Sequence, residues 1–178
     1  IRVAGFDPVL QRLPDDEQLM GRMEPTVILP KPPSNIRPPR LSDIWQMCAS
    51  LRQDEIDQYM AMTSEPRWDF EQAARRFDRM IGHKICLFDT DGAPIIVAGW
   101  EPIVPGVFDG WMLGTEEGWA KHWRAITKVT RWGMDYLMAS GAHRLQIMSL
   151  ASRDSACEWY ERGLKMRQEG TLAQYGRH

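Results

Sequence analysis

The chain has 178 residues, of which 43% are hydrophobic and 26% are charged, a composition typical of a globular domain. Its formal net charge of −2 gives no overall attraction to nucleic acid or to an anionic membrane. No apolar run approaches the roughly 18 residues that a membrane span requires, and no signal peptide is visible. We therefore expect neither a membrane protein nor a specific nucleic-acid-binding protein.

The first 34 residues differ from the rest because they are rich in proline. Proline fixes φ and lacks an N–H donor, so this stretch is a poor candidate for a long helix or a central strand. Its main apolar cluster is Val27, Ile28 and Leu29, which is short enough to add as a strand to the edge of a partner's sheet. Two interpretations stay open: a disordered arm, or an extended arm that becomes ordered on a partner. The predicted organisation is an arm at residues 1–34 and a domain at residues 35–178.

The predicted domain begins with a short strand and three short helices. Residues 35–37 form at most a short strand, because Pro38 and Pro39 follow. Ser42, Asp54 and Asp69 are each placed to cap the start of a helix. The remaining predicted elements, in chain order, are strands at 84–88 and 95–100, a loop at 101–106, a strand at 108–115, a helix at 119–139, a strand at 144–150, a helix ending near 162, and a final pair of strands at 164–167 and 172–175.

The unit from residue 108 to residue 141 is the best candidate for a ligand site. An apolar strand leads through a turn at residues 116–118 into the longest predicted helix of the chain. A strand that enters a helix through a tight loop directs backbone N–H groups at an anion that binds there. Glu116 and Glu117 lie in this loop, where a helix N-terminus favours negative charge. The same two acids would stand close to any phosphate, so we expect them to weaken its binding.

Three short motifs, in this order, resemble the GNAT acetyltransferase superfamily. The segment IRPPRLSDI at residues 36–44 resembles the opening strand and first helix of that family. The segment TEEGWA at residues 115–120 lies where the family has its Gln/Arg-x-x-Gly-x-Gly/Ala loop. Ala156, Tyr160 and the pair at residues 163–164 resemble the family's C-terminal Ala-x-x-x-Tyr-x-x-x-Gly-Phe pattern, with one residue fewer between the tyrosine and the glycine. In overall texture the chain is most similar to the GNAT-like internal virion proteins of short-tailed bacteriophages.

The resemblance implies a fold and a set of roles. The implied fold is a GNAT-like α/β (α+β) domain, with a mixed, mostly antiparallel sheet and helices on both faces. Thr115, Gly118 and Ala120 correspond to the loop that binds acetyl-CoA in this family. Tyr160 corresponds to the general acid that returns a proton to the CoA thiolate, and Glu101 is a candidate general base for an amine. A satisfied core tyrosine and an exposed loop acid are the alternative interpretations of these last two residues.

Two further patterns have ordinary explanations beside functional ones. Lys121, Arg124, Lys128 and Arg131 form a basic stripe along the long helix, which is either a solvated face or a surface for an acidic group. The cysteines have no CxxC spacing and predict buried thiols rather than a disulfide framework or a zinc site. We expect no metal site.

The first functional hypothesis is a non-catalytic structural protein of a tailed-phage particle or its assembly, which contacts other virion proteins through its arm. It would reside in the host cytoplasm before assembly and in the virion afterwards, with no cofactor. The alternative is an acetyl-CoA-dependent N-acetyltransferase. A third hypothesis is a binder of host cytoplasmic proteins. Glu116 and Glu117 favour a non-catalytic role, whereas Gly118, Ala120 and Tyr160 favour the enzyme.

Overall fold

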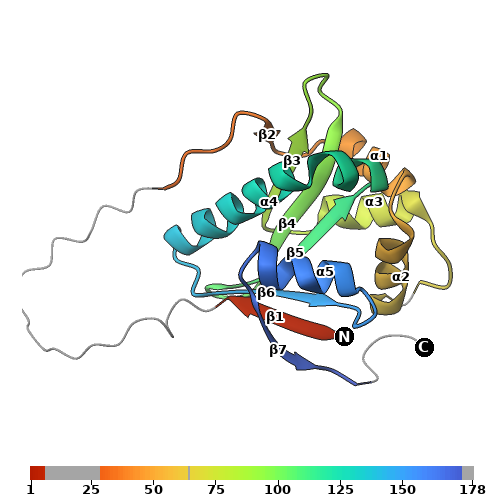
Figure 1. Ribbon diagram of the computed structural model, residues 1–178. Helices are drawn as coiled ribbons and strands as arrows, with labels where there is room; N and C mark the ends of the chain where they lie inside the picture. Colours follow the sequence, from red (N-terminus) through yellow and green to blue (C-terminus); the bar gives the residue numbers. More distant parts are fainter. Residues whose placement is uncertain (7–28, 64, 174–178) are drawn as a thin grey trace, which may run out of the picture.

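The computed structural model describes residues 1–6, 29–63 and 65–173. In this part of the chain, seven strands form one sheet in the order β2-β3-β4-β5-β6-β1-β7 (Figure 1). Only β5 and β6 run parallel, and the other neighbours are antiparallel. The predicted mixed, mostly antiparallel sheet is therefore confirmed. The strands are β1 (Arg2–Phe6), β2 (Ile36–Arg37), β3 (His83–Phe88), β4 (Pro94–Val104), β5 (Val107–Gly114), β6 (Arg144–Ser149) and β7 (Arg167–Thr171).

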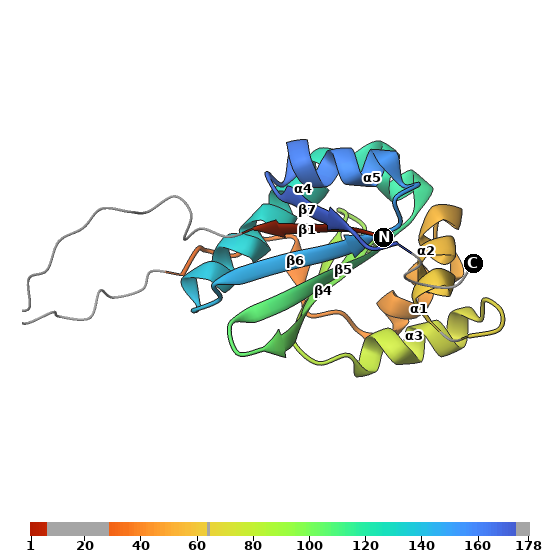
Figure 2. The same ribbon diagram turned by 90° about the horizontal axis from the view of Figure 1, so that it is seen from below.

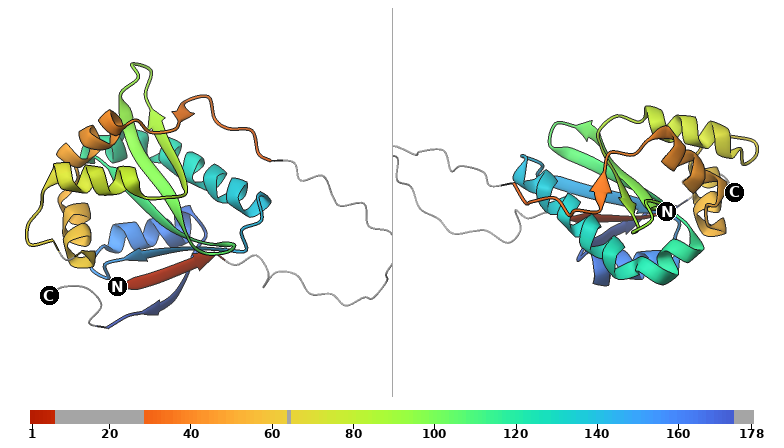
Figure 3. Two further views of the ribbon diagram at one scale, coloured as in Figure 1. Left: turned by 180° about the vertical axis from the view of Figure 1, so that it is seen from behind. Right: turned by 90° about the horizontal axis from the view of Figure 1, so that it is seen from above.

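Helices cover both faces of the sheet, as predicted (Figure 2). One face carries α1 (Leu41–Ala49), α2 (Gln53–Met62) and α3 (Phe70–Arg79). The other face carries α4 (Glu116–Ala139) and α5 (Asp154–Glu158), which continues into a π-helical turn (Trp159–Gly163). Each layer buries its own apolar core against the sheet. Figure 3 shows α1, α2 and α3 together on their side of the sheet.

Local sequence signals explain several of these elements. The Asp69 side chain caps α3 by accepting hydrogen bonds from the N–H groups of Glu71 and Gln72. Thr115 caps α4, so Glu116 and Glu117 belong to the first turn of this helix and not to a separate turn. The backbone of α4 is kinked at His122. Strand β4 continues to Val104 through the segment predicted as a loop.

The start of the chain differs from the predicted arm at residues 1–34. Residues 2–6 form β1, which pairs with β6 on one side and with β7 on the other. Ile1 continues this pairing, because its carbonyl oxygen accepts a hydrogen bond from Leu172 N–H. The predicted domain boundary at residue 35 therefore excludes a strand that belongs to the sheet. Residues 7–28 lie outside the described part of the chain, so the arm itself stays a prediction.

Strands β5 and β6 are hydrogen-bonded over only part of their length. The ladder joins Val107 to Arg144, Phe108 to Leu145 and Asp109 to Gln146. Beyond these pairs the two strands separate, while β5 stays paired with β4 as far as Gly114. The edge of β5 from Gly110 onward therefore faces a gap in the sheet. We call this gap the split; it determines where the candidate site lies.

Candidate active site

A cavity of about 560 Å³ occupies the split, and residues from both faces of the sheet line it. A pocket that is confined to one face would be lined by the helices of that face alone. Here the lining comes from both helix layers and from both separated strands. The α1–α3 side contributes Tyr59, Phe77 and Trp111, and the α4–α5 side contributes Ala120, Thr130 and Trp159. The cavity therefore spans the gap between the two helix layers.

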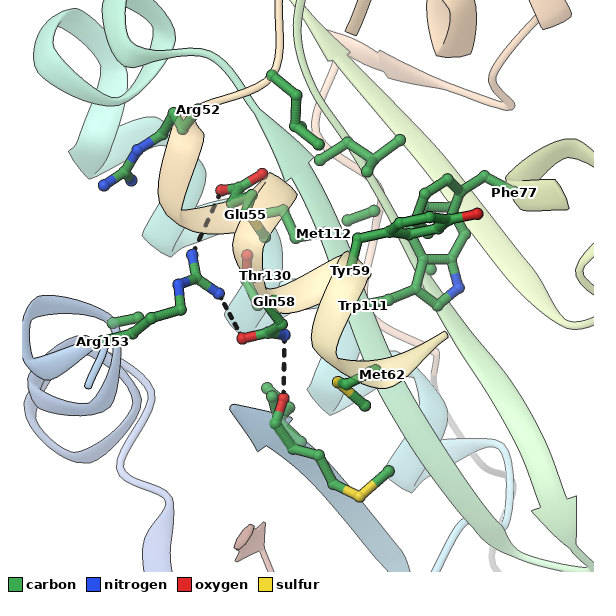
Figure 4. A pocket seen from close by; sticks show the side chains of 18 of the residues that line it. Arg52, Glu55, Gln58, Tyr59, Met62, Phe77, Trp111, Met112, Thr130 and Arg153 are labelled. Atoms are coloured by element: carbon green, nitrogen blue, oxygen red, sulfur yellow. Dashed lines mark hydrogen bonds and ion pairs between the residues drawn. The ribbon is translucent and has the colours of Figure 1, made fainter. Parts of the chain in front are cut away.

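Glu55, on α2, places a buried carboxyl group at the open end of the split (Figure 4). The residue is 8% exposed, and its Oε2 accepts a hydrogen bond of 3.0 Å from Gly114 N–H on β5. Burial raises the pKa of Glu55 to about 7, although the Gly114 N–H and the guanidinium groups of Arg153 and Arg52 favour the charged form. A carboxyl group with this pKa can accept a proton near neutral pH.

Arg153 connects Glu55 to the start of α5. Its Nη2 lies 3.7 Å from Glu55 Oε1, and its Nε lies 2.9 Å from Asp54 Oδ2. Its Nη1 donates a hydrogen bond of 2.7 Å to Gln58 Oε1 (Figure 4). The Arg153 side chain is only 9% exposed, so these contacts hold α2 against the end of β6 with little access for water.

Tyr160 lies in the π-helical turn after α5 and lines the same cavity. Burial raises its pKa to about 12, whereas Arg153 and a hydrogen bond with Ser149 favour the charged form. The phenol is therefore protonated at neutral pH and can donate a proton. Glu55 adds to the rise in this pKa through its charge, so the two groups lie within electrostatic reach of each other. Tyr160 thus lines the same cavity as a carboxyl group that sequence reasoning did not single out.

Glu101 and Asp109 form an acidic pair at the closed end of the split. They are opposite each other in the β4–β5 ladder, and both line the cavity. Burial, and then the nearby charge of Glu101, raise the pKa of Asp109 to about 6. Its Oδ1 is buried and accepts no hydrogen bond within the described residues. Glu101 therefore lies in β4 beside the cavity, and not in the loop where it was predicted.

The predicted cofactor residues have different positions at the start of α4. Ala120 lines the cavity together with its neighbour Trp119. Thr115 serves as the helix cap, since its hydroxyl accepts a hydrogen bond of 2.9 Å from Gly118 N–H. Gly118 is required for packing, because a Cβ there would lie 2.8 Å from the Ile95 carbonyl oxygen. Thr115 and Gly118 therefore shape the start of α4 and do not line the cavity.

The two acids of the predicted loop are each paired with a base. Glu116 Oε2 lies 3.1 Å from Arg52 Nε, and Glu117 pairs with Lys121 one turn later. This pairing holds the pKa of Glu117 below its usual range through the Lys121 hydrogen bond. The acids thus meet an incoming anion as ion pairs and not as isolated charges, which weakens the expected repulsion.

The basic stripe on α4 is largely engaged within the chain. Lys121 pairs with Glu117, and the Arg124 guanidinium stacks over the Trp123 ring at 4.7 Å. Arg131 Nε donates a hydrogen bond of 2.7 Å to the Gly163 carbonyl oxygen. The stripe therefore serves mainly to solvate and anchor α4, and the structure gives no reason to assign it a ligand.

The remaining predictions concern the partner-binding segment, the cysteines and a metal site. Val27 and Ile28 lie outside the described residues, and Leu29 is 46% exposed. The three cysteines are buried, and burial raises the pKa of Cys48 to about 12. Within the described ranges, no group of side chains is arranged to hold a metal ion. No helix there is long and apolar enough to cross a bilayer.

Comparison with solved structures identifies the class of fold. Spermidine N-acetyltransferase from Vibrio cholerae, solved with CoA and spermine, matches with a TM-score of 0.62 at 14% identity, over 80% of this chain and 85% of that one. Ribosomal-protein-alanine N-acetyltransferase from Brucella melitensis matches with a TM-score of 0.58 at 16% identity, over 80% and 90%. The GNAT-superfamily phosphinothricin acetyltransferase from Sinorhizobium meliloti, solved with acetyl-CoA, matches with a TM-score of 0.56 at 16% identity, over 80% and 81%.

The chain therefore has the fold of the GNAT N-acetyltransferases, as the sequence motifs predicted. No family model matches the sequence, and no curated protein matches it either. The narrower resemblance to phage internal virion proteins stays a prediction.

Proposed function

We propose that the protein is an acetyl-CoA-dependent N-acetyltransferase whose reaction takes place in the split between β5 and β6. The observation that carries this proposal is the cavity in the split, which is lined from both faces of the sheet and by both Glu55 and Tyr160. A base near neutral pKa and a protonated acid are the two groups that acetyl transfer to an amine requires. The structural neighbours are acetyltransferases, which supports the same activity.

The residues of the split fit acetyl-CoA as a substrate. Gly114 N–H points away from β4 to reach Glu55. Backbone groups alternate along a strand, so the N–H and C=O of Met112 point into the split as well. Trp119 adds a buried indole N–H that has no hydrogen-bond partner within the described residues. These donors can hold the amide and carbonyl oxygens of the substrate, while the first turn of α4 offers its N–H groups to the phosphates.

Glu55 serves as the general base in this proposal. An amine reacts as the free base, so a carboxylate must take a proton from the ammonium group or from the attacking nitrogen. The pKa of about 7 lets Glu55 be ionised in part at neutral pH and still bind the proton that it receives. Asp109, with a pKa of about 6, lies farther along the split and can relay a proton from the closed end.

Tyr160 serves as the general acid. The amine nitrogen forms a bond to the acetyl carbonyl carbon, the carbon–sulfur bond breaks, and the sulfur leaves as a thiolate. Tyr160 then transfers its phenolic proton to that sulfur. The Tyr160 phenol stays protonated up to high pH because burial raises its pKa to about 12, so it is available for this step at neutral pH.

Calorimetric titration with acetyl-CoA tests the proposal directly. We expect a dissociation constant in the micromolar range for the wild type. Ala120→Trp places a bulky ring at the wall of the cavity and should abolish measurable binding of acetyl-CoA. The matched control is Lys128→Trp, which places the same ring on an exposed position of α4. Wild-type protein that binds no acetyl-CoA at millimolar concentration would reject the enzyme and leave the virion role as the next hypothesis.

The virion role and its partner proteins stay predictions. The expected contact segment at residues 27–29 lies mostly outside the described part of the chain. The names of the structural neighbours point to enzymes and give no support to a phage particle.

A further inference from the structure

On the edge of β6 that faces the split, backbone groups form hydrogen bonds with the side-chain amide of Gln58. Gln58 Nε2 donates a hydrogen bond of 3.2 Å to the Met148 carbonyl oxygen. Leu150 N–H donates one of 3.3 Å to Gln58 Oε1. Both backbone groups lie on the edge of β6 that faces β5, beyond Gln146, where the ladder to β5 ends. Gln58 thus extends the ladder with a side chain from α2.

The register of the ladder shows what Gln58 replaces. Phe108 lies opposite Leu145, so an unbroken ladder would place Met112 opposite Ser149. In a parallel ladder, the residue opposite Ser149 donates to the preceding carbonyl and accepts from the following N–H. Those are the two bonds that the Gln58 amide makes. Gln58 therefore occupies the position of a peptide group in an extended chain.

The surroundings of this position are built to hold an amide. Besides Leu150 N–H, the Gln58 oxygen receives hydrogen bonds from Arg153 Nη1 at 2.7 Å and from Ser149 Oγ at 3.2 Å. We call this set the β6 cradle: the Met148 carbonyl, the Ser149 hydroxyl, the Leu150 N–H and the Arg153 guanidinium. A carbonyl oxygen has two lone pairs, so three donors exceed what one amide needs. Arg153 is almost wholly buried, so the cradle is a preformed site.

We infer that the β6 cradle binds the first amide of a peptide acceptor, and that Gln58 holds this place until the acceptor displaces it. This inference rests on the proposed function and names its substrate class as a peptide N-terminus. Gln58 reaches the cradle from α2, on the face opposite α4, so a ligand that takes its place enters from the face that carries α1, α2 and α3 (Figure 3). The edge of β5 at Met112 stays available to the thioester.

Neighbouring groups fit the rest of such an acceptor. Glu55 precedes Gln58 by three residues, so their side chains lie one helical turn apart, at roughly 5–6 Å between Cβ atoms. The amine of a peptide precedes its first amide by one residue, roughly 3.5 Å. An amide in the cradle therefore brings the amine near Glu55. Tyr59, Phe77 and Trp111 form an apolar wall beside it, which suits a large apolar first side chain.

The test compares three acceptors that differ at the amide: the tripeptide Leu-Gly-Gly, its ester isostere in which oxygen replaces the first amide N–H, and 3-methylbutylamine. Binding to the full chain is measured by calorimetry without acetyl-CoA, so the result does not depend on catalysis. We expect the ester to bind about three- to tenfold more weakly than the peptide, because it cannot donate to the Met148 carbonyl. We expect the simple amine to bind more weakly still. Equal binding of all three, or no binding of the peptide, would overturn the inference.

Gln58→Ala removes the competing amide. We expect this variant to bind Leu-Gly-Gly about threefold or more tightly than the wild type, with acetyl-CoA binding unchanged. The matched control is Gln53→Ala, which removes an exposed glutamine from the same helix and should change neither. Weaker peptide binding by Gln58→Ala in a variant that still unfolds cooperatively would show that Gln58 is structural. Tighter acetyl-CoA binding would show that the cradle serves the donor.

The two proposals fail separately. Peptide binding without acetyl transfer to any amine rejects the proposed function and keeps the cradle. Acetyl transfer to 3-methylbutylamine as efficient as to Leu-Gly-Gly keeps the enzyme and rejects the cradle as an acceptor site.

Discussion

Both halves of β5 pair with β4, but they differ at the edge that faces β6. The first half, up to Asp109, is paired on both edges, and its partner Leu145 on β6 is wholly buried in an apolar core. The second half, from Gly110 to Gly114, is paired with β4 alone. There, side chains of α2 form hydrogen bonds to backbone groups that no strand pairs. Glu55 accepts one from Gly114 N–H on the β5 edge, and Gln58 accepts one from Leu150 N–H on the β6 edge.

This difference shows how a sheet can be opened while some of its backbone groups keep hydrogen-bond partners. Buried backbone groups require hydrogen-bond partners, so an empty gap would cost free energy at each unpaired group. Side-chain partners satisfy three of these groups: the Gly114 N–H, the Met148 carbonyl oxygen and the Leu150 N–H. In the proposed function, the paired half supplies rigidity and the split half supplies the acetyl-transfer site.

The largest expected effect lies in the paired half. Leu145→Ala removes a side chain that is fully buried where β5 and β6 are joined. We expect a loss of about 2–5 kcal/mol in the free energy of unfolding, because the core there cannot collapse around the cavity. Urea denaturation provides the measurement. Met148→Ala, on the split half of β6, is the control and should cost clearly less. Equal losses in the free energy of unfolding would show that the two halves contribute equally to stability.

In the split half, we expect stability to depend on pH through Glu55. Its pKa is about 7 in the folded state and near the ordinary 4.5 when unfolded. The folded state binds the proton more tightly, so this contribution is fully present below pH 4.5 and is lost as pH rises through 7. The full difference is about 3 kcal/mol. Glu55→Gln should remove this dependence and gain stability over the wild type at alkaline pH.

Urea denaturation of the wild type and Glu55→Gln at several pH values measures this difference. Asp57→Asn, on the exposed side of the same helix, is the control and should follow the wild type. A constant stability difference between wild type and Glu55→Gln across this range would show that Glu55 is ionised alike in the folded and unfolded states.

The smallest of these free-energy changes concerns Tyr160. Tyr160→Phe should lower the turnover number for acetyl transfer at least about tenfold, because the thiolate loses its proton donor. The variant should lose only about 1 kcal/mol of stability, since one hydrogen bond is removed. Tyr136→Phe, on α4 and outside the cavity, is the control and should keep full activity. Unchanged turnover in Tyr160→Phe would exclude it from the mechanism.

Much of the fold could be predicted from local signals, since the Asp69 cap, the Asp-Gly hairpin between β3 and β4 and the long α4 are all encoded within a few residues. Strand β1 was missed because its short segment is followed by the proline-rich stretch and pairs with strands more than 140 residues away. The split could not be predicted either, because the end of a ladder between distant strands leaves no local pattern.

The site was predicted in part for a similar reason. Tyr160 and Ala120 were found because family motifs mark them. Glu55 was overlooked as an ordinary acid in the first turn of a helix. Its spacing of four from Tyr59, a core residue of α2, places it on the apolar side of this helix, and this spacing is the signal that could have identified it.

In the proposed function, the split is an acetyl-transfer site in which Glu55 takes the proton from the amine. The pH dependence of kcat/KM for acetyl transfer, measured for the wild type and for Glu55→Gln, tests this role of Glu55. We expect the wild-type value to rise as pH rises toward about 7, where Glu55 loses its proton, and then to level off. We expect Glu55→Gln to be at least about 100-fold slower and to lack this rise if Glu55 has this role. The same rise in Glu55→Gln, at a rate near that of the wild type, would contradict it.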